Sequence, residues 1–288
     1  MNKKVSKAWL FLTLPLVGIA IFTVYPLFYG AYLSMFGQRG PRMWFVGLYN
    51  YITVFKDPSF WGGFGLPVFI LLIQVPIMLG IAVILSLILD SGRLKYPSLY
   101  RTFFFMPYAV PTVVSGLIWG YMFSSALSPF IPLLKTIGIN VNFLSSGSLP
   151  WVMLNIMTWE WAGYNIVLIY STLLSIPKEI SEQAKIDGAN DFQTALYIKL
   201  PLLKTTLLIL FIFSIIGSLQ IFNEPMMLSG ITNIPPNFTP SMYVYNQAFS
   251  YGSFTYATTA AIILGAIIFV FSFFFLRLSM KQLEENVE

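Results

Sequence analysis

The carboxyl group of Glu160 is the feature of this sequence with the clearest chemical potential, because it interrupts a long apolar stretch. It stands between two indole rings, those of Trp159 and Trp161. A carboxylate accepts hydrogen bonds from hydroxyl groups, and an aromatic face can cover an apolar surface of a ligand. We therefore expect Glu160 to meet a polar partner or a wet cavity that holds a ligand. The alternative is a buried structural acid with no ligand role.

Two further groups of polar side chains occur beside apolar stretches. Tyr108 and Thr112 lie four residues apart, a spacing that places both on one face of a helix. Gln220, Asn223 and Glu224 add amide and carboxylate groups where another apolar stretch ends. These residues suit a path for a polar solute, although the last three are equally compatible with an ordinary polar helix end.

Residue types that the sequence lacks exclude several kinds of chemistry. There is no cysteine and no histidine, so disulfides, thiolate nucleophiles and histidine proton shuttles are excluded. No Gly-x-x-x-x-Gly-Lys sequence is present to cradle a nucleotide phosphate. We therefore expect no catalytic residue, no metal site and no ATPase site in this chain. A membrane enzyme would need paired acids or a nucleophile with a base, which these residues do not supply.

The elements that must position these groups are membrane-spanning helices. Of 288 residues, 57% are hydrophobic and only 9% charged, against roughly 25% charged in a soluble domain. A spanning helix needs about 20 mostly apolar residues. Six stretches qualify: Ala8 to Tyr32, Leu66 to Leu89, Phe103 to Phe123, Leu149 to Ile176, Thr205 to Phe222 and Ala257 to Leu276. The predicted fold is an all-α integral membrane protein with six transmembrane helices, forming one domain over residues 1–288. The first stretch is too long for a signal peptide, so we expect it to be retained.

Lysine and arginine predict the orientation, because they concentrate in cytoplasmic loops. With the N-terminus inside, twelve of them fall on the cytoplasmic side: Lys3, Lys4, Lys7, Arg93, Lys95, Arg101, Lys178, Lys185, Lys199, Lys204, Arg277 and Lys281. Four fall outside: Arg39, Arg42, Lys56 and Lys135. We therefore expect a multi-pass protein of the cell membrane with both termini cytoplasmic. The net charge of +5 reflects these loops and gives no reason to expect a nucleic-acid partner.

The cytoplasmic loop between the fourth and fifth stretches, residues 175–204, has the pattern of a helix-turn-helix. Pro177 suits the first turn of a helix, and Gly188 suits its end, because glycine readily adopts the left-handed cap conformation. A second short helix is expected from Asn190, with Pro201 breaking it before the fifth stretch. On these grounds alone, an ordinary amphipathic loop is an equal alternative.

This loop resembles the coupling motif of permease subunits in binding-protein-dependent ABC importers. The matching positions are Glu182, Ala184, Asp187, Gly188, Ala189, Ile198, Leu200 and Pro201. Two positions depart from the motif, since Gln183 replaces the usual alanine and Ala195 the usual large aromatic residue. The resemblance implies that the loop couples the chain to a cytoplasmic ATPase, which binds ATP and Mg²⁺.

The rest of the chain resembles the carbohydrate permeases of the maltose and glycerol-phosphate type within that family. The stretches that carry the resemblance are Phe45 to Tyr51, Tyr100 to Pro107 and Ile118-Trp119. In maltose-type relatives, positions that match Tyr108, Thr112, Trp159, Ala162 and Gly163 line the sugar site. The resemblance therefore implies a substrate path through these residues.

The expected function is that of a pore subunit moving a sugar or oligosaccharide from an extracellular binding protein into the cell. The resemblance implies a second homologous permease, two cytoplasmic ATPase subunits and the binding protein as partners. No lysine or arginine lies within a predicted span, and a charged substrate normally meets a cation on its path, so a neutral sugar is favoured. The alternative is a secondary carrier in which Glu160 couples protons.

Overall fold

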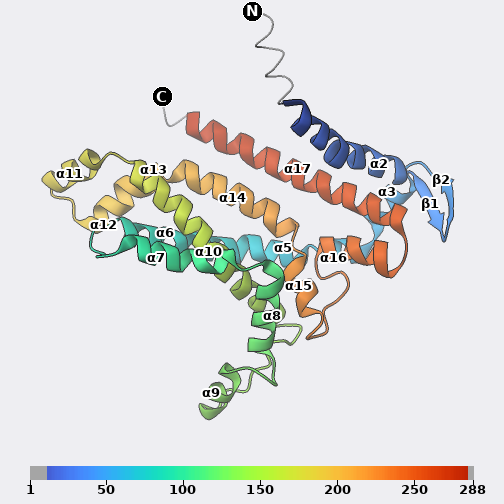
Figure 1. The fold of residues 1–288 in the computed structure, drawn as a ribbon, viewed down its shortest axis with the longest axis horizontal. Helices are drawn as coiled ribbons and strands as arrows, with labels where there is room; N and C mark the ends of the chain where they lie inside the picture. Colours follow the sequence, from blue (N-terminus) through green and yellow to red (C-terminus); the bar gives the residue numbers. More distant parts are fainter. Residues whose placement is uncertain (1–11, 285–288) are drawn as a thin grey trace, which may run out of the picture.

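The computed structural model describes residues 12–284, and these residues form an elongated, almost entirely helical molecule. The exception within the described range is one antiparallel hairpin of β1 (Phe36–Arg39) and β2 (Arg42–Phe45). The hairpin lies at one end of the molecule, and α11 (Lys178–Ile186) and α12 (Asp191–Thr194) lie at the other (Figure 1). One predicted outside segment and the predicted cytoplasmic loop therefore lie at opposite ends of the structure.

Apolar helices long enough to cross a membrane account for a large part of the described chain. Four stretches combine the required length and composition: Leu12–Leu33, Pro58–Asp90, Lys204–Leu228 and Phe254–Arg277. The bent pair α7 (Pro97–Phe105) and α8 (Thr112–Phe123) makes a fifth if it is counted as one span. Helix α10 (Leu149–Ser175) has 27 residues, about 40 Å at 1.5 Å per residue, but Glu160 and two amides, Asn155 and Asn165, make it less apolar. The count of six spans therefore stays a prediction.

Shorter helices complete these stretches. The second stretch joins α4 (Pro58–Gly62), α5 (Gly65–Phe69), a π-helical turn (Ile70–Gln74) and α6 (Val75–Asp90). Leu12–Leu33 contains α2 (Tyr25–Leu33), and Lys204–Leu228 contains α14 (Lys204–Leu219) and α15 (Asn223–Leu228). Phe254–Arg277 is the first part of α17 (Phe254–Glu284). Residues 8–11 of the first predicted span, and Lys3, Lys4 and Lys7, lie outside the described residues.

The third predicted span is not one straight helix. A 3-10 turn (Met106–Ala109) follows α7, and α8 then leaves at 91°. Pro111 causes the break, because the residue before a proline avoids the helical region, and Val110 is extended at φ −78° and ψ 128°. The prediction that Tyr108 and Thr112 share a helix face is therefore wrong. Figure 1 shows α8 projecting from the body toward α9 (Phe130–Thr136).

Helix α10 is the centre of the packing. It runs along α6, where Ser86 Oγ donates a hydrogen bond of 3.0 Å to the carbonyl oxygen of Ile166. Two clusters of buried side chains flank it. The first includes Ile70, Val75, Met153, Ile156 and Leu228, and the second includes Ala82, Leu89, Ile169, Leu173 and Leu210. Between helices in lipid, close packing and interhelical hydrogen bonds provide the association energy.

A third cluster ties the hairpin end together. Side chains of α3 (Tyr49–Lys56) and α4 pack against α16 (Pro240–Tyr245) and α17. Tyr243 Oη donates a hydrogen bond of 2.5 Å to Asp57 Oδ2, and Asp57 also caps α4 by accepting from the backbone N–H of Ser59. This network fixes the loop before the sixth span against the start of the second.

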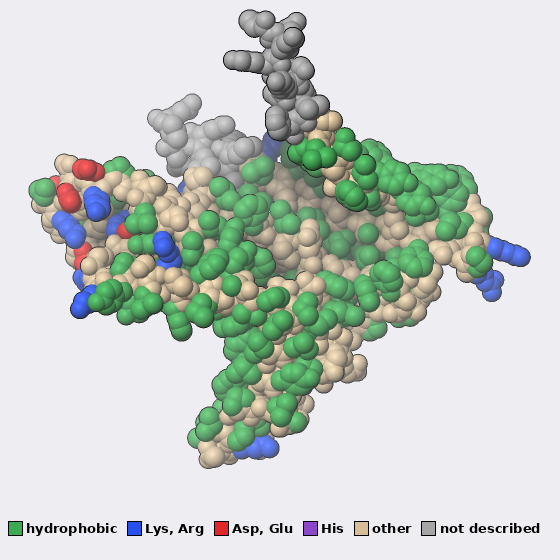
Figure 2. All heavy atoms as spheres, in the orientation of Figure 1, with side chains coloured by type: hydrophobic (Ala, Val, Ile, Leu, Met, Phe, Trp, Pro, Cys, Tyr) green, Lys and Arg blue, Asp and Glu red, His purple; other side chains and the backbone are tan. Residues whose placement is uncertain are grey.

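Apolar side chains cover much of the surface, as a lipid environment requires. Figure 2 shows them along the body, while lysine, arginine and acidic side chains gather at the end that carries α11 and α12. In α2, Leu27 and Phe28 are exposed, and no residue of the first span is buried. These faces suit contact with lipid or with another membrane subunit.

Candidate functional site

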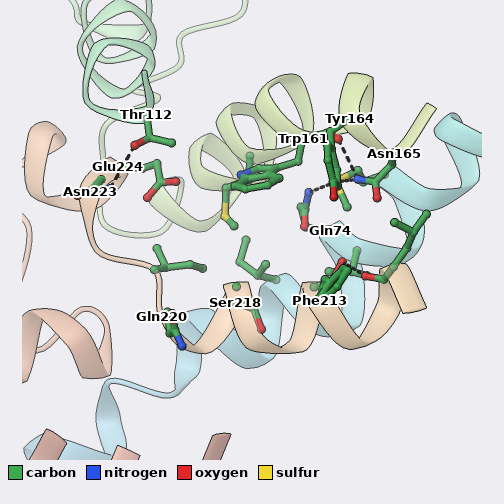
Figure 3. A pocket seen from close by; sticks show the side chains of 18 of the residues that line it. Gln74, Thr112, Trp161, Tyr164, Asn165, Phe213, Ser218, Gln220, Asn223 and Glu224 are labelled. Atoms are coloured by element: carbon green, nitrogen blue, oxygen red, sulfur yellow. Dashed lines mark hydrogen bonds between the residues drawn. The ribbon is translucent and has the colours of Figure 1, made fainter. Parts of the chain in front are cut away.

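A cavity of about 230 Å³ lies inside the membrane-spanning part of the molecule (Figure 3). It is enclosed by α10, α14, the π-helical turn before α6, and the start of α15. Its polar lining consists of Gln74, Thr112, Tyr164, Asn165, Ser214, Ser218, Gln220, Asn223 and Glu224. None of the described residues that line it is a lysine or arginine. The cavity therefore offers neutral hydrogen-bonding groups and one carboxyl group.

Two buried amides form its inner wall. Gln74 is 1% exposed and Asn165 is 4% exposed. Gln74 Nε2 donates to Thr158 Oγ1 at 3.2 Å, and Asn165 Nδ2 donates to the carbonyl oxygen of Trp161 at 2.8 Å. Both amide nitrogens also approach the thioether sulfur of Met78, at 3.4 and 3.6 Å, which is a weak acceptor. Buried amides are costly without partners, so their presence at this depth marks a polar site.

Aromatic rings form a second wall. Trp161 and Tyr164 both line the cavity, with ring centroids 6.2 Å apart. Tyr108 packs behind them, 5.5 Å from the Trp161 ring and 5.0 Å from the Tyr164 ring. Figure 3 shows Trp161 pointing into the space between α10 and α14. An aromatic ring beside amide groups suits a sugar, because the ring covers its apolar C–H face while the amides bind its hydroxyl groups.

Four of the predicted path residues line this cavity: Thr112, Gln220, Asn223 and Glu224. Asn223 Nδ2 donates to Thr112 Oγ1 at 3.2 Å, so the break after Pro111 and the break after α14 meet at the mouth of the cavity. Asn223 and Gln220 are exposed, whereas Glu224 is 6% exposed. Polar groups therefore extend from the surface of the chain to its interior.

Apart from Tyr108, the other predicted path residues lie on α10 outside the lining of this cavity. Glu160 is 2% exposed, accepts a hydrogen bond from the Ser115 hydroxyl, and places its carboxyl group against that of Glu224. Trp159 packs edge-on against Trp119 at 5.9 Å, and Ala162 is half-buried outside the cavity lining. A role for these residues in the substrate path stays a prediction.

Gly163 lies at a close crossing of two helices. A Cβ atom at this position would come within 2.0 Å of the carbonyl oxygen of Phe104 in α7. Only a residue without a side chain permits this approach, and small residues at helix crossings are typical of membrane proteins. Gly163 therefore sets the position of α7 against α10, and through it the position of Tyr108.

Sequence reasoning missed Gln74 and Asn165 as cavity residues, and it noted Trp161 beside Glu160 without selecting it as a path residue. A signal for the two amides was present, since Gln74 is the one amide in the second predicted span and Asn165 interrupts the fourth. An amide in an apolar stretch needs a partner for the same reason as Glu160 does. The sequence signal for Trp161 was its position beside Glu160, but it did not distinguish a ligand contact from ordinary packing, since an indole ring serves both.

The loop of residues 175–204 forms two short helices joined by a tight turn. After α11, the N–H groups of Gly188 and Ala189 donate to the carbonyl oxygens of Lys185 and Ala184 at 3.1 and 2.9 Å. Hydrogen bonds of this kind end a helix whose next residue, usually glycine, has the left-handed backbone conformation, and Gly188 has a φ of +88°. Asn190 and Gln193 then form a reciprocal capping box at the start of α12.

Pro201 does not end this second helical segment. A π-helical turn (Ala195–Lys199) and α13 (Leu200–Leu202) continue it through the proline, and the break comes at Leu203. Proline fits near the start of α13, because the wider turn before it relieves the clash that proline causes in a regular helix. The expected break at Pro201 is therefore wrong by two residues.

The residues that match the coupling motif are not all on the surface of this loop. Glu182, Asp187 and Gly188 are exposed, but Ala184 is 6% exposed and packs within the chain, and Ala189 is half-buried. Two large apolar side chains that sequence reasoning did not select, Ile186 and Phe192, are 85% and 73% exposed. Exposed apolar groups of this size beside a turn are suited to a protein contact.

Ion pairs hold the loop against the end of α6. Asp191 pairs with Arg93 and, at 3.2 Å, with Lys185. Hydrogen bonds from Lys185 and Arg93 lower the pKa of the Asp191 carboxyl below its usual value. Lys199 Nζ lies 2.5 Å from Asp90 Oδ2, at side-chain exposures of 18% and 15%. Among residues 12–284, no group of three or more acidic residues could hold a metal ion.

Comparison with known proteins places these features in a family. Residues 82–286 match the family described as "Binding-protein-dependent transport system inner membrane component". The chain is similar to the lactose transport system permease protein LacF of Rhizobium radiobacter, at 32% identity over 92% of this chain and 91% of that protein. It is also similar to the multiple sugar-binding transport system permease protein MsmF of Streptococcus mutans, at 32% identity over 95% of each.

A solved structure shares the fold. A subunit of a bacterial ABC transporter involved in the import of the acidic polysaccharide alginate matches with a TM-score of 0.83 and 20% sequence identity. The match covers 97% of this chain and 98% of that subunit. The arrangement of helices described above is therefore one known among transporter subunits.

Proposed function

The chain belongs to the family of binding-protein-dependent transport system inner membrane components, and from this premise we propose that it is a pore subunit of an ATP-driven importer of a neutral sugar or oligosaccharide. In this role the chain moves substrate and leaves ATP hydrolysis to a partner. The absence of a phosphate-binding glycine loop in the sequence supports that division of labour.

The observation that carries the proposal is the lining of the cavity. Gln74 and Asn165 offer neutral hydrogen-bonding groups, Trp161 offers an aromatic face, and no cation lines the space among the described residues. An anionic substrate would require compensation of its charge, and the one ionisable acid there, Glu224, has the wrong sign. Hydroxyl groups, in contrast, are matched by amide and carboxyl groups.

The proposed partners follow from the two ends of the molecule. At one end, Ile186, Phe192 and the Gly188 turn would contact a cytoplasmic ATPase that binds ATP and Mg²⁺. At the other, the β1–β2 hairpin end would face an extracellular sugar-binding protein. The exposed apolar faces would contact lipid and a second homologous permease, so that two permeases stand over two ATPase subunits. Both termini would then be cytoplasmic, as the lysine and arginine distribution predicts.

Purification of the tagged chain from its native membrane tests this assembly. The chain should co-purify with one second permease and two ATPase copies, and ATP hydrolysis by the complex should rise when sugar-loaded binding protein is added. The same assay on the isolated chain should show neither hydrolysis nor transport. Sugar transport by the isolated chain on addition of ATP would overturn the proposal.

A further inference from the structure

The inner half of the cavity contains acceptors that no described protein group satisfies. Both amide nitrogens of Gln74 and Asn165 are engaged, but no hydrogen bond from residues 12–284 reaches Gln74 Oε1 or Asn165 Oδ1. Both side chains are more than nine-tenths buried and line the cavity. Their carbonyl oxygens are therefore available to accept hydrogen bonds from hydroxyl groups of whatever occupies the space.

The remaining walls limit what that occupant is. Ser214 and Ser218 donate to backbone carbonyls of their own helix, at 2.9 Å each, so these hydroxyl hydrogens are already used. Trp161 presents its ring, and Met157, Leu210 and Ile221 add apolar surface. A volume of about 230 Å³ is below the 300–1,000 Å³ usual for whole drug-sized ligands. The space suits one ring that carries hydroxyl groups on its edge and C–H groups on its face.

We propose that Gln74, Asn165 and Trp161 form a subsite within this subunit that binds a single neutral sugar ring. This inference rests on the proposed import function and adds the residues that recognise the substrate. The subsite lies on the face of α10 that carries Trp161 and Asn165, not the face of Trp159, Ala162 and Gly163. Sugar enters past Gln220 and Asn223, which are exposed at the mouth.

Substitution of the two amides by apolar side chains of similar shape tests the subsite. In the full transport complex, Gln74→Met and Asn165→Leu should each raise the lactose concentration for half-maximal ATP-driven uptake about three- to ten-fold, because each removes an acceptor for a sugar hydroxyl. Asn155→Leu is the matched control, since Asn155 is a half-buried amide of α10 that does not line the cavity. Its half-maximal concentration should stay unchanged.

A fluorescence measurement gives an answer even if the amide variants do not fold. The difference in emission between the parent complex and Trp161→Phe isolates the Trp161 signal. Lactose, or another neutral sugar that the complex transports, should protect Trp161 from acrylamide quenching over the concentration range that saturates uptake. A cavity that holds only water gives no protection.

The outcomes separate the subsite from the proposed function. Unchanged affinity in folded amide variants, or unprotected Trp161, would overturn the subsite while ATP-driven uptake by the parent complex persists. Failure of the parent complex to take up any neutral mono- or oligosaccharide with ATP would instead overturn the proposed function, whatever the variants do.

Discussion

Lys199 donates a hydrogen bond of 2.5 Å to Asp90, and this pair joins the segment after α12 to the end of α6. Helix α6 begins directly after Gln74, so a single helix connects the ion pair with the cavity wall. At 1.5 Å per residue, its 16 residues span about 24 Å. A movement of the loop of residues 175–204 would therefore reach the cavity through α6.

The Asp90–Lys199 pair predicts a measurable coupling between the two residues. Both side chains are more than four-fifths buried, so removal of one leaves an uncompensated charge on the other. Melting of Asp90→Ala, Lys199→Ala and the double variant in detergent should give a coupling energy of about 1–3 kcal/mol. The exposed Arg93–Asp191 pair is the control and should show much weaker coupling. Additive effects at Asp90 and Lys199 would contradict the account.

The pH dependence of the loop follows from Asp191. Its pKa is lower in the folded loop than in an unfolded chain, so its ion pairs stabilise the loop above the unfolded value, near 3.9, and are lost as the pH falls through the folded value. Titration of Asp191 should therefore not change the protection of residues 178–199 from hydrogen exchange between pH 5 and 8, where the contribution of its ion pairs is constant. In that range, Asp191→Asn should increase exchange, and high salt should weaken the difference. Equal exchange in both proteins at low salt would contradict a structural role for the pairs.

The left-handed turn at Gly188 predicts different effects on uptake for two substitutions. At a φ of +88°, valine is strongly disfavoured, whereas asparagine tolerates left-handed conformations. We expect Gly188→Val to lower ATP-driven uptake at least ten-fold while the protein still inserts in the membrane, and Gly188→Asn to retain most uptake. Wild-type uptake by the valine variant would show that this turn does not couple the chain to its ATPase.

The close crossing of α7 and α10 predicts that one methyl group added at Gly163 lowers the stability of the protein. In Gly163→Ala the new Cβ would overlap the carbonyl oxygen of Phe104, so the helices must separate. Overpacking of this kind costs about 1–3 kcal/mol, which should lower the detergent melting temperature by several degrees. Gly80→Ala is the control, because its Cβ would meet no atom within 4 Å and alanine favours a helix. Equal melting of the two variants would show that the crossing is not tight.

Local features of the fold were predictable from the sequence where one residue type determines the backbone. Gly188 ends α11 because glycine adopts the left-handed cap, and the apolar stretches appear as long helices because their composition requires it. The bend at Pro111 was not predicted, since proline inside an apolar stretch is also compatible with one spanning helix. Local pattern does not distinguish a kink from a break.

The site was predictable only in part. Gln220, Asn223 and Glu224 were found because polar groups at the end of an apolar stretch are conspicuous, and Thr112 was found from its spacing to Tyr108 and from family resemblance. Their convergence with Gln74 was not predictable, since it depends on how α6, α10 and α14 pack. The face of α10 toward the cavity differs from the face selected by resemblance, and one residue along a helix rotates a side chain by about 100°.

A measurement of which energy source drives sugar uptake tests the central claim most directly. Proteoliposomes should contain the chain with its second permease and ATPase subunits, with ATP enclosed and binding protein plus radiolabelled lactose outside. We predict that lactose, or another neutral sugar tested in its place, accumulates only with enclosed ATP and regardless of a protonophore. Accumulation that follows an imposed pH gradient and needs no ATP would contradict it, and would make the chain a proton-coupled carrier.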